Sequence, residues 1–560
     1  MSRFGGLGYA IRMGIFLALA SSTVAANEKG IDRVLQEYNR SDSPGCSVGV
    51  FQHGQLAFAK GYGLASLELG VPNNPQTVFY IGSTSKQFVA ASIVLAAQQG
   101  HLSLDDDIRK YLPEIPSYGE TITIRHLVHH TSGLRDYLEL MFLGGYPFEN
   151  IYTDEWIVEL IARQKALNFQ PGEQHLYSNT GYFLLAQIVE RATGQTLRRF
   201  ADENIFKPLG MVHTHFHDDR NHVVEDRAMA YSVGEDGDYS LDWYTNFDKV
   251  GSGGLLTTVE DLLLWDRVFY GTAFGGEAFV DQMLERGKLD NGQVLDYAFA
   301  LAHGEYRGLP TIEHSGGFMG FRAQLLRFPE QHLSVASLCN LASADPSLIS
   351  QDVAALFLAN QMAPDEVDST ADAPVAALER SPTELERIAG LYWSPDNRFT
   401  REIRVDDGKL MYVRSPENKT ELAPLANGAY RMIDVPVLVE VRFEPTDTAP
   451  TTRMVVTVAG DDSTTLERID PWHPSANELR PFAGTYYNDE LDTEYTVEVE
   501  DDGLLVQADA PNETALVPVI QGLFTTTDGG SFRFEWTAEG AVETFTIDAG
   551  RARGLKFVKR

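Results

Sequence analysis

The chain has 560 residues, a length that exceeds one ordinary domain and favours three or four. Its 43% hydrophobic and 11% aromatic residues are typical of packed globular protein. The formal net charge of −34 argues against binding to nucleic acid or to an anionic membrane surface, so neither is expected as a partner.

Residues 1–26 have the pattern of a secretory signal peptide. Arg3 and Arg12 give a positive start, residues 15–20 form a short apolar stretch, and small residues at 24–26 suit a cleavage site. The apolar stretch is too short to span a bilayer, and no other segment has a transmembrane pattern. We therefore expect a periplasmic or secreted protein with no integral membrane segment after signal removal.

Cys46 and Cys339 are the only cysteines, which excludes a disulfide-rich scaffold. Each lies in a β-like run. Two buried thiols and a single disulfide bond, which export would permit, both stay open.

Residues 45–64 predict a β-hairpin that turns at His53 and Gly54. The stretch also holds Gly45-Cys46-Ser47-Val48-Gly49, which matches the string of a nucleophile elbow. An elbow needs a strand, a sharp turn and a helix, whereas Ser47 lies inside a strand that another strand follows. Ser47 is therefore rejected as a nucleophile.

Residues 78–100 predict a reactive serine at the start of a helix. An apolar run at 78–81 leads to Gly82, and apolar residues then recur at helical spacing from Ser83 onward. Lys86 follows Ser83 by three residues and so shares its helix face. A neighbouring base can activate a serine hydroxyl, and burial can lower the pKa of a lysine enough for that task. The alternative is a helix cap beside a solvated lysine.

Residues 127–137 predict a helix end that runs into a turn. His129 and His130 have the chemistry of catalytic bases, but histidines beside Thr131-Ser132-Gly133 more often hold loop backbone in place. We favour that structural role and keep His130 as a minor candidate.

Residues 169–194 predict a turn, a loop and an amphipathic helix over 183–191. The loop carries Tyr177 and Asn179, a phenol and an amide just before the helix. A tyrosine can act as a general acid or base where neighbouring cations lower its pKa. The alternative is a packed tyrosine and an asparagine helix cap.

Two further stretches have some features of ligand sites, but we expect no ligand site of these kinds in either. His213, His215 and His217 share one strand face, but no carboxylate or cysteine lies at ligand spacing with them, so no metal is expected. Residues 251–258 form a glycine-rich turn into a helix over 259–269, without the lysine of a phosphate loop. We expect backbone close to a substrate cleft there, and no cofactor.

Residues 312–326 predict a strand that carries His314, Ser315, Gly316 and Gly317. Glycines in a strand let a ligand or another chain come close to its backbone. The amide of Gly317, with that of Ser83, would complete an oxyanion hole, in which each donor typically raises the rate about 10²–10³-fold.

Three motifs in one order, Ser83-Thr84-Ser85-Lys86, Tyr177-Ser178-Asn179 and His314-Ser315-Gly316, resemble the active-site motifs of the penicillin-recognising serine hydrolases. That family includes class C β-lactamases, D-alanyl-D-alanine carboxypeptidases, related esterases and D-aminopeptidase. The resemblance covers residues 27–362. It implies an α+β, β-lactamase/transpeptidase-like domain in which helices flank an antiparallel sheet.

The resemblance also implies roles for these residues. Ser83 would be the acylated nucleophile, Lys86 its proton acceptor and Tyr177 the proton shuttle. Asn179 would bind the acyl-side amide of a small-molecule or peptide substrate. His314 would line the opposite wall and orient Tyr177 or a substrate carboxylate, and Ser315 and Gly316 would also bind substrate. Which of Lys86 and Tyr177 is the base in each step stays open, because interacting groups titrate as a unit.

The third motif departs from that of the β-lactamases, which usually carry Lys-Thr-Gly there and use the charge of the lysine to bind the carboxylate of the antibiotic. His314 has an ordinary pKa near 6.5 and is mostly neutral at pH 7. This departure weakens the case for an efficient β-lactamase, and it is similar to what peptidases and D-aminopeptidase show.

The last third of the chain predicts two further domains. Residues 363–382 are rich in Pro, Ala and acidic residues and predict a linker. Beyond it, LERIAGLYW at 385–393 recurs as LRPFAGTYY at 479–487, which indicates an internal repeat. Short alternating runs in each copy predict two small antiparallel, lipocalin-like β-barrels at 383–470 and 475–560.

A serine hydrolase followed by two such barrels is similar to D-aminopeptidase, in which a barrel loop reaches the active-site mouth. A loop near Asp528, Gly529 and Gly530 would do so here; the alternative is that the barrels are spacers or assembly surfaces. We expect an exported acyl-enzyme hydrolase of small D-amino-acid amides or peptides. An esterase, a weak class C-like β-lactamase, or a penicillin-binding sensor or scaffold without turnover are the alternatives. The natural substrate and the oligomeric state, including a homo-oligomer, stay open.

Overall fold

The computed structural model describes residues 27–560 apart from 235, 243–245, 365–379, 396–398, 416–417, 426, 434, 436–438, 445–450, 459–461, 501–502, 509–512 and 527–529. The predicted signal peptide, most of the predicted linker, and Asp528 and Gly529 lie outside the described residues. In the described part of the chain, no helix is long and apolar enough to cross a membrane.

The chain divides into two compact units. Unit 1 consists of the described residues of Met1–Leu134, Phe148–Ala162 and Phe169–Ala363. Unit 2 consists of those of Arg135–Pro147, Arg163–Asn168 and Pro364–Arg560.

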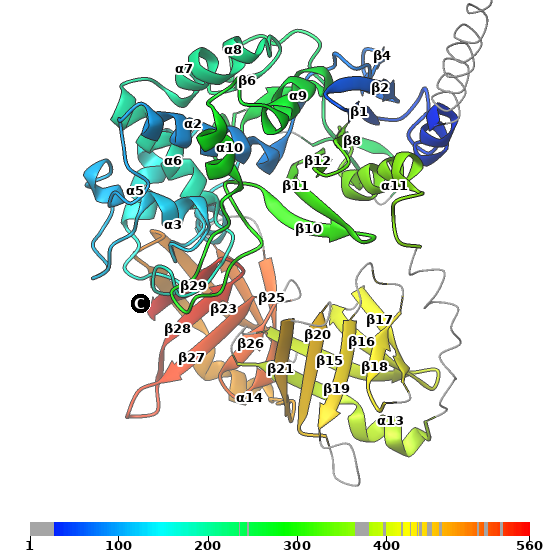
Figure 1. Cartoon of the computed structure of the whole chain (residues 1–560). Coiled ribbons are helices and arrows are strands. Elements are labelled where there is room, and N and C mark those ends of the chain that lie inside the picture. The colour runs from blue at the N-terminus through cyan, green and yellow to red at the C-terminus, as the bar shows by residue number, and fades with distance from the viewer. Residues whose placement is uncertain are drawn as a thin grey trace, which may run out of the picture. The chain divides into compact units, whose positions relative to one another are not determined.

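A six-stranded antiparallel sheet in the order β10-β11-β12-β13-β1-β2 forms the centre of unit 1 (Figure 1). The predicted hairpin at 45–64 is confirmed, because β1 pairs with β2 in antiparallel fashion. The single strand predicted over 312–326 is wrong. These residues belong to two strands, joined by a tight turn in which Met319 has a φ of 50°. The strands are β1 (Cys46–Gln52), β2 (Gln55–Tyr62), β10 (Ala302–Tyr306), β11 (Leu309–Phe318), β12 (Phe321–Phe328) and β13 (Leu333–Cys339).

Helices cover both faces of this sheet. Val48 and Val50 of β1 pack in one core with α11 (Pro346–Leu358), whereas Gly49, between them, faces Val259 of α9 (Val259–Asp266). Because successive strand residues point to opposite faces, α9 and α11 lie on opposite sides. A disulfide bond joins Cys46 and Cys339, which are paired on β1 and β13, so the question left open by the sequence is answered.

A second group of helices surrounds α2, which is buried from Lys86 to Ala96 because its sequence is apolar on almost every side (Figure 1). Helix α6 begins at Asn179, four residues before the predicted start, and ends at Gly194 with a φ of 74°. The helices of this group are α2 (Lys86–Gln98), α3 (Ile124–Val128), α5 (Asp154–Ala162), α6 (Asn179–Thr193), α7 (Leu197–Ala201), α8 (Lys207–Leu209) and α10 (Glu277–Leu284).

A small three-stranded sheet in the order β5-β9-β6 includes β5, the strand that directly precedes the motif serine in the chain. Its strands are β5 (Phe79–Tyr80), β9 (Leu255–Thr257) and β6 (His215–Phe216). The remaining strands of unit 1 are β3 (Leu64–Ser66), β4 (Val71–Pro72), β7 (Tyr231–Val233) and β8 (Tyr239–Leu241).

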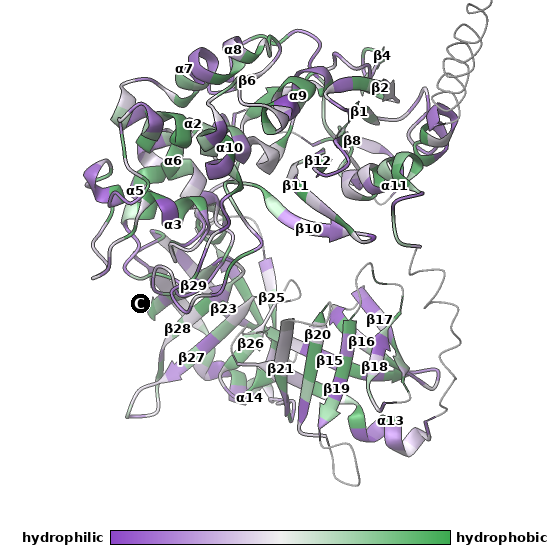
Figure 2. Ribbon diagram, in the orientation of Figure 1, coloured by the Kyte–Doolittle hydropathy of each residue, from purple (hydrophilic) through white to green (hydrophobic). Residues whose placement is uncertain are grey.

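Two closed eight-stranded antiparallel barrels form most of unit 2, as the repeat predicted. Buried and more exposed residues alternate along their strands, so hydrophobic (green) and hydrophilic (purple) residues are mixed along the barrels in Figure 2. The repeat preserves a contact, because the hydroxyl of Tyr392 donates to the carbonyl of Ile388 and that of Tyr486 donates to the carbonyl of Phe482.

The first barrel contains β14 (Gly390–Ser394), β15 (Phe399–Asp406), β16 (Lys409–Ser415), β17 (Asn418–Pro424), β18 (Tyr430–Met432), β19 (Val439–Glu444), β20 (Arg453–Val458) and β21 (Asp462–Ile469). The second contains β22 (Gly484–Asn488), β23 (Thr493–Glu500), β24 (Gly503–Ala508), β25 (Glu513–Ile520), β26 (Leu523–Thr525), β27 (Ser531–Trp536), β28 (Val542–Ala549) and β29 (Ala552–Lys559). Short helices α13 (Pro382–Ile388) and α14 (Ala476–Leu479) precede them.

Unit 2 also contains two early segments of the chain, 135–147, which carries α4 (Tyr137–Leu143), and 163–168. The buried guanidinium of Arg135 forms an ion pair with Glu490 at 2.7 Å and donates to the carbonyl of Arg553 at 2.8 Å. Asn168 exchanges hydrogen bonds with the backbone of Arg551 and Arg553. These two segments are therefore packed as part of the second barrel's compact unit.

Candidate active site

Ser83 lies in a single 3₁₀ turn, Gly82–Ser85, that connects β5 to α2. Gly82 has a φ of 51°, a conformation that favours glycine, and a Cβ there would lie 2.6 Å from the amide nitrogen of Gly317. The glycine thus allows the turn that carries Ser83 to approach β11 closely. The predicted position of Ser83 near a helix N-terminus is confirmed.

Lys86, the first residue of α2, is completely buried and reaches three oxygens. Its Nζ donates to Ser83 Oγ at 2.9 Å, to Asn179 Oδ1 at 3.0 Å and to the backbone carbonyl of Ser252 at 2.5 Å. An ammonium group has three hydrogens to donate, so these three acceptors match it. The lysine is therefore held against the serine hydroxyl by groups from two other segments.

Tyr177 and Asn179 come from the start of α6, and Asn179 is its first residue. The Tyr177 ring centroid is 4.9 Å from Lys86 Nζ, a distance at which the cation interacts with the ring. The ring also packs against His130, with centroids 4.2 Å apart. The ring of Tyr177 thus lies beside Lys86, the residue that donates to Ser83.

His130 has the structural role that we favoured. Its Nδ1 accepts a hydrogen bond from the backbone amide of Ser178 at 3.1 Å, which holds the loop that carries Tyr177. Burial and, secondarily, the charge of Lys86 hold the pKa of His130 well below its usual value. The ring is therefore neutral at pH 7.

His314 lies on β11 with its ring buried. Its Nδ1 is 2.6 Å from the carbonyl of Ser315, so Nδ1 carries the proton, and its Nε2 accepts from the hydroxyl of Tyr297 at 2.9 Å. Burial, followed by the charge of Lys86, lowers the pKa of His314 to about 4. The ring centroid is 6.3 Å from that of Tyr177, so a neutral imidazole forms one wall of the site.

The adjacent glycines of β11 differ in their surroundings. A Cβ on Gly316 would lie 2.0 Å from the carbonyl oxygen of Ile81, whereas one on Gly317 would meet Arg322 at an ordinary 3.5 Å. Thr84 Oγ1 also donates to the carbonyl of His314 at 3.3 Å. The third motif is thereby packed directly against the turn that carries Ser83.

The sequence did not reveal Ser252 and Tyr297 as part of the site. Ser252 belongs to the glycine-rich turn at 251–254, for which we predicted only backbone near a cleft, and it contributes the carbonyl that accepts from Lys86. Tyr297 lies in a segment with no motif, and its buried contact with His314 in the structure reveals it.

Other candidates lie elsewhere or lack the geometry. Ser47 is buried in β1 and donates to the carbonyl of Asn74, in agreement with its rejection. His215 and His217 pack near His222, but among the described residues no group of three or more His, Cys, Asp or Glu is arranged to hold a metal ion.

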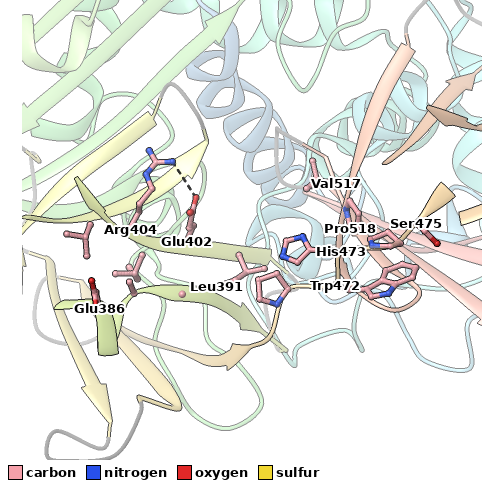
Figure 3. Close-up of a pocket in the computed structure, with 15 residues that line it drawn as sticks. Glu386, Leu391, Glu402, Arg404, Trp472, His473, Ser475, Val517 and Pro518 are labelled. Atoms are coloured by element: carbon pink, nitrogen blue, oxygen red, sulfur yellow. Dashed lines mark ion pairs between the residues drawn. The ribbon is translucent and has the colours of Figure 1, made fainter. Parts of the chain in front are cut away.

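A cavity of about 940 Å³ lies in unit 2 and is lined by residues such as Leu391, Trp472, His473 and Pro518 (Figure 3). Glu402 and Arg404 face each other at 3.9 Å on one wall. Its serine, Ser475, donates to the carboxylate of Glu478 as a helix cap, and no lysine is among the residues that line this cavity. The cavity therefore lacks the arrangement found around Ser83.

Comparisons with known proteins agree with this geometry. The model of the Beta-lactamase family matches residues 31–374. The chain is 28% identical over 470 residues to a D-aminopeptidase of Gluconobacter oxydans, covering 82% of each chain. It is 29% identical over 303 residues to penicillin-binding protein 4* of Bacillus subtilis, covering 51% of this chain and 66% of that protein.

Among solved structures, the octameric penicillin-binding protein homologue from Pyrococcus abyssi aligns with a TM-score of 0.56 at 23% identity. The alignment covers 79% of this chain and 100% of that chain. At 23% identity, this similarity shows a shared fold alone.

Proposed function

The chain belongs to the beta-lactamase family, and on that premise we propose that it is a serine hydrolase that forms an acyl-enzyme on Ser83 and cleaves small D-amino-acid amides or peptides. The contact of Lys86 Nζ with Ser83 Oγ at 2.9 Å carries this proposal. A hydroxyl becomes nucleophilic when a positioned group takes its proton, and the buried lysine and adjacent phenol supply such groups.

The reaction takes two steps in this site. Ser83 Oγ attacks the substrate carbonyl while its proton passes to the coupled pair of Lys86 and Tyr177, in the form that lacks one proton (amine with phenol, or ammonium with phenolate). The amides of Ser83 and Gly317 receive the oxyanion. Tyr177 delivers a proton to the leaving nitrogen, which departs as an amine. A water molecule then attacks the acyl-enzyme, activated by the same pair, and releases the acid. Asn179, whose Oδ1 accepts from Lys86, would bind the acyl side of the substrate.

Two observations support a D-amino-acid substrate over a β-lactam. The similarity to the D-aminopeptidase extends over 470 residues, a length that requires more than the hydrolase domain alone. The neutral His314 replaces the fixed cation that a β-lactam carboxylate would meet. The assignment of substrate therefore rests on the barrels and on the third motif together.

Export to the periplasm or outside the cell is also part of the proposal. The pattern of residues 1–26 favours it, and the disulfide bond between Cys46 and Cys339 supports it, because such bonds persist in oxidising compartments. Fractionation of cells that express the full chain, with N-terminal sequencing of the product, tests it. An intact N-terminus in the cytoplasm would contradict export.

Hydrolysis of D-alanine amide, L-alanine amide, p-nitrophenyl butyrate and a chromogenic cephalosporin tests the activity, with Ser83→Ala as the inactive control. We expect turnover of the D-amide above the others, and its loss in Ser83→Ala. Faster turnover of the ester with the D-amide untouched would instead indicate an esterase. A stoichiometric burst with the cephalosporin and no steady turnover would favour a penicillin-binding role, which the similarity to penicillin-binding protein 4* makes the second candidate.

A further inference from the structure

A small cavity of about 220 Å³ borders the candidate active site on the side of Tyr177 and His314. It lies where the pairing of β10 with β11 stops, at Ala302 opposite Glu313. From His314 onward, the edge of β11 has no partner residue from β10. The cavity is therefore the space between this edge and the end of β10.

This cavity lies on the leaving-group side of the scissile bond, an inference that rests on the proposed function. Gly317, whose amide would bind the oxyanion, is two residues and so about 7 Å further along β11 than Ser315, which lines the cavity. Tyr177, which would protonate the leaving nitrogen, lines the cavity itself. The part of the substrate that leaves is thus directed toward it.

The cavity presents hydrogen-bond acceptors. Glu313 projects its carboxylate here and receives one hydrogen bond, from Gln324 Nε2 at 2.7 Å. The other amide atom of Gln324, Oε1, is buried and has no hydrogen-bond partner among the described residues, although the side chain is only 2% exposed. A buried acceptor without a donor is costly, so a ligand that donates hydrogen bonds would stabilise it.

Among the residues that line this cavity, Glu313 is the acidic one. None of its lining residues is Lys or Arg, and His314 is neutral. The lining residue Ser347 is hydrogen-bonded through its amide to a further carboxylate, that of Asp345, at 3.0 Å. Lys86 directs its Nζ to three oxygens of the site.

We propose that Glu313, with Gln324, selects the leaving group, favouring neutral or cationic leaving groups over those that carry a carboxylate. An amide or an amine-bearing substrate would place an N–H donor between the two acceptors. A leaving group with an α-carboxylate, as in a free dipeptide, would bring like charges together in a partly buried space, where the repulsion is weakly screened. Such substrates are therefore poor ones for this chain.

Three substrates with the same D-alanyl group test this proposal: D-alanyl-glycine, D-alanyl-glycinamide and the mono-amide of D-alanine with 1,2-diaminoethane. Their leaving groups are of similar size and differ in charge. In the wild-type chain we expect kcat/KM to be about 10- to 100-fold higher for the diaminoethane amide than for D-alanyl-glycine. In Glu313→Gln this ratio should fall by at least about tenfold, chiefly through faster turnover of D-alanyl-glycine.

Glu305→Gln is the matched control, since Glu305 is an exposed acid on β10 that does not line the cavity. It should keep the wild-type ratio. An equal loss for all three substrates in Glu313→Gln, or an unchanged ratio, would overturn the proposal.

The same series with L-alanyl and butyryl groups separates the two proposals. If the D-alanyl substrates are not turned over faster than the L-alanyl and butyryl ones, but the three leaving groups keep their order of rates, the result counts against the proposed function alone. Equal rates for the three leaving groups in every series that is turned over would count against the role of Glu313 alone.

Discussion

Lys86 is the residue on which the geometry of the site depends most, because its Nζ joins oxygens from three segments. Replacing it by Met keeps an apolar chain of similar length but removes the donor and the proton relay. We expect kcat/KM to fall about 10²–10⁴-fold, the range for loss of a positioned acid or base. Steady-state kinetics on the D-amide would measure it. Lys110→Met, on the exposed surface, should stay at the wild-type rate.

The protonation of His314 makes the folded state sensitive to acid. Its pKa is about 4 when folded and near 6.5 when unfolded, so above pH 6.5 the residue is neutral in both states. Between pH 6.5 and 4 the unfolded chain binds a proton that the folded chain does not, and the free energy of unfolding falls, by about 3 kcal/mol for this residue.

Urea unfolding of the wild-type chain and of His314→Gln at pH 7.0 and 4.5 measures this effect. The variant lacks the titrating group, so its free energy of unfolding should decline less over the same interval. An equal decline in both proteins would show that His314 is not the source.

At the scale of elements, the approach of β11 to the turn at Gly82–Ser85 sets how Ser83 meets the third motif. Gly316→Ala would place a methyl group 2.0 Å from the backbone oxygen of Ile81 and so force the two elements apart. We expect kcat to fall by at least about 10²-fold, the effect of misplacing reacting groups by about 1 Å. Gly271→Ala, far from the site residues in the sequence, is the control. A Cβ on Gly271 would meet only the backbone oxygen of Arg267, at 3.9 Å, so its kcat should stay within about threefold of wild type.

The ion pair of Arg135 and Glu490 connects an early segment to the second barrel within unit 2. Its side chains are 1% and 7% exposed, so Glu490→Ala leaves a buried charge without its partner. Such a break typically costs about 3–5 kcal/mol of stability, measurable by urea unfolding. The control is Glu494→Ala. Glu494 pairs with Arg560 and is more exposed than Glu490, so its loss should cost less than about 1 kcal/mol of stability. Similar losses in the two variants would contradict a special role for Arg135.

At the scale of the whole molecule, the disulfide bond closes a loop between residues that are 293 positions apart. In the chain-entropy view, a loop of this length stabilises the folded state by about 5 kcal/mol. Cys46→Ala with Cys339→Ala should therefore lower the Tm, and dithiothreitol should lower that of the wild type but not that of the variant. If the Tm of the double variant equals that of the oxidised wild type, the result contradicts this estimate.

Much of the molecule follows from local patterns, and the rest depends on distant contacts. Helical spacing after Ser83, the hairpin at 45–64 and the repeat that yields two barrels were predictable, because each is encoded in a few neighbouring residues. Tyr297 and Ser252 were not, because their importance comes from atoms that they meet far along the chain. The turn at Met319 was missed because a non-glycine residue adopts its positive φ.

Arg135 and its neighbours are likewise far apart in sequence from the barrel against which they pack. Residues 135–147 and 163–168 are encoded in the middle of the hydrolase sequence, yet they pack with the C-terminal barrel. A recombination event at the linker would exchange the barrel and leave these segments behind, with a buried arginine matched to a carboxylate no longer present. The barrel and the two segments must therefore be inherited together. A cut at the linker does not divide this chain into independent domains.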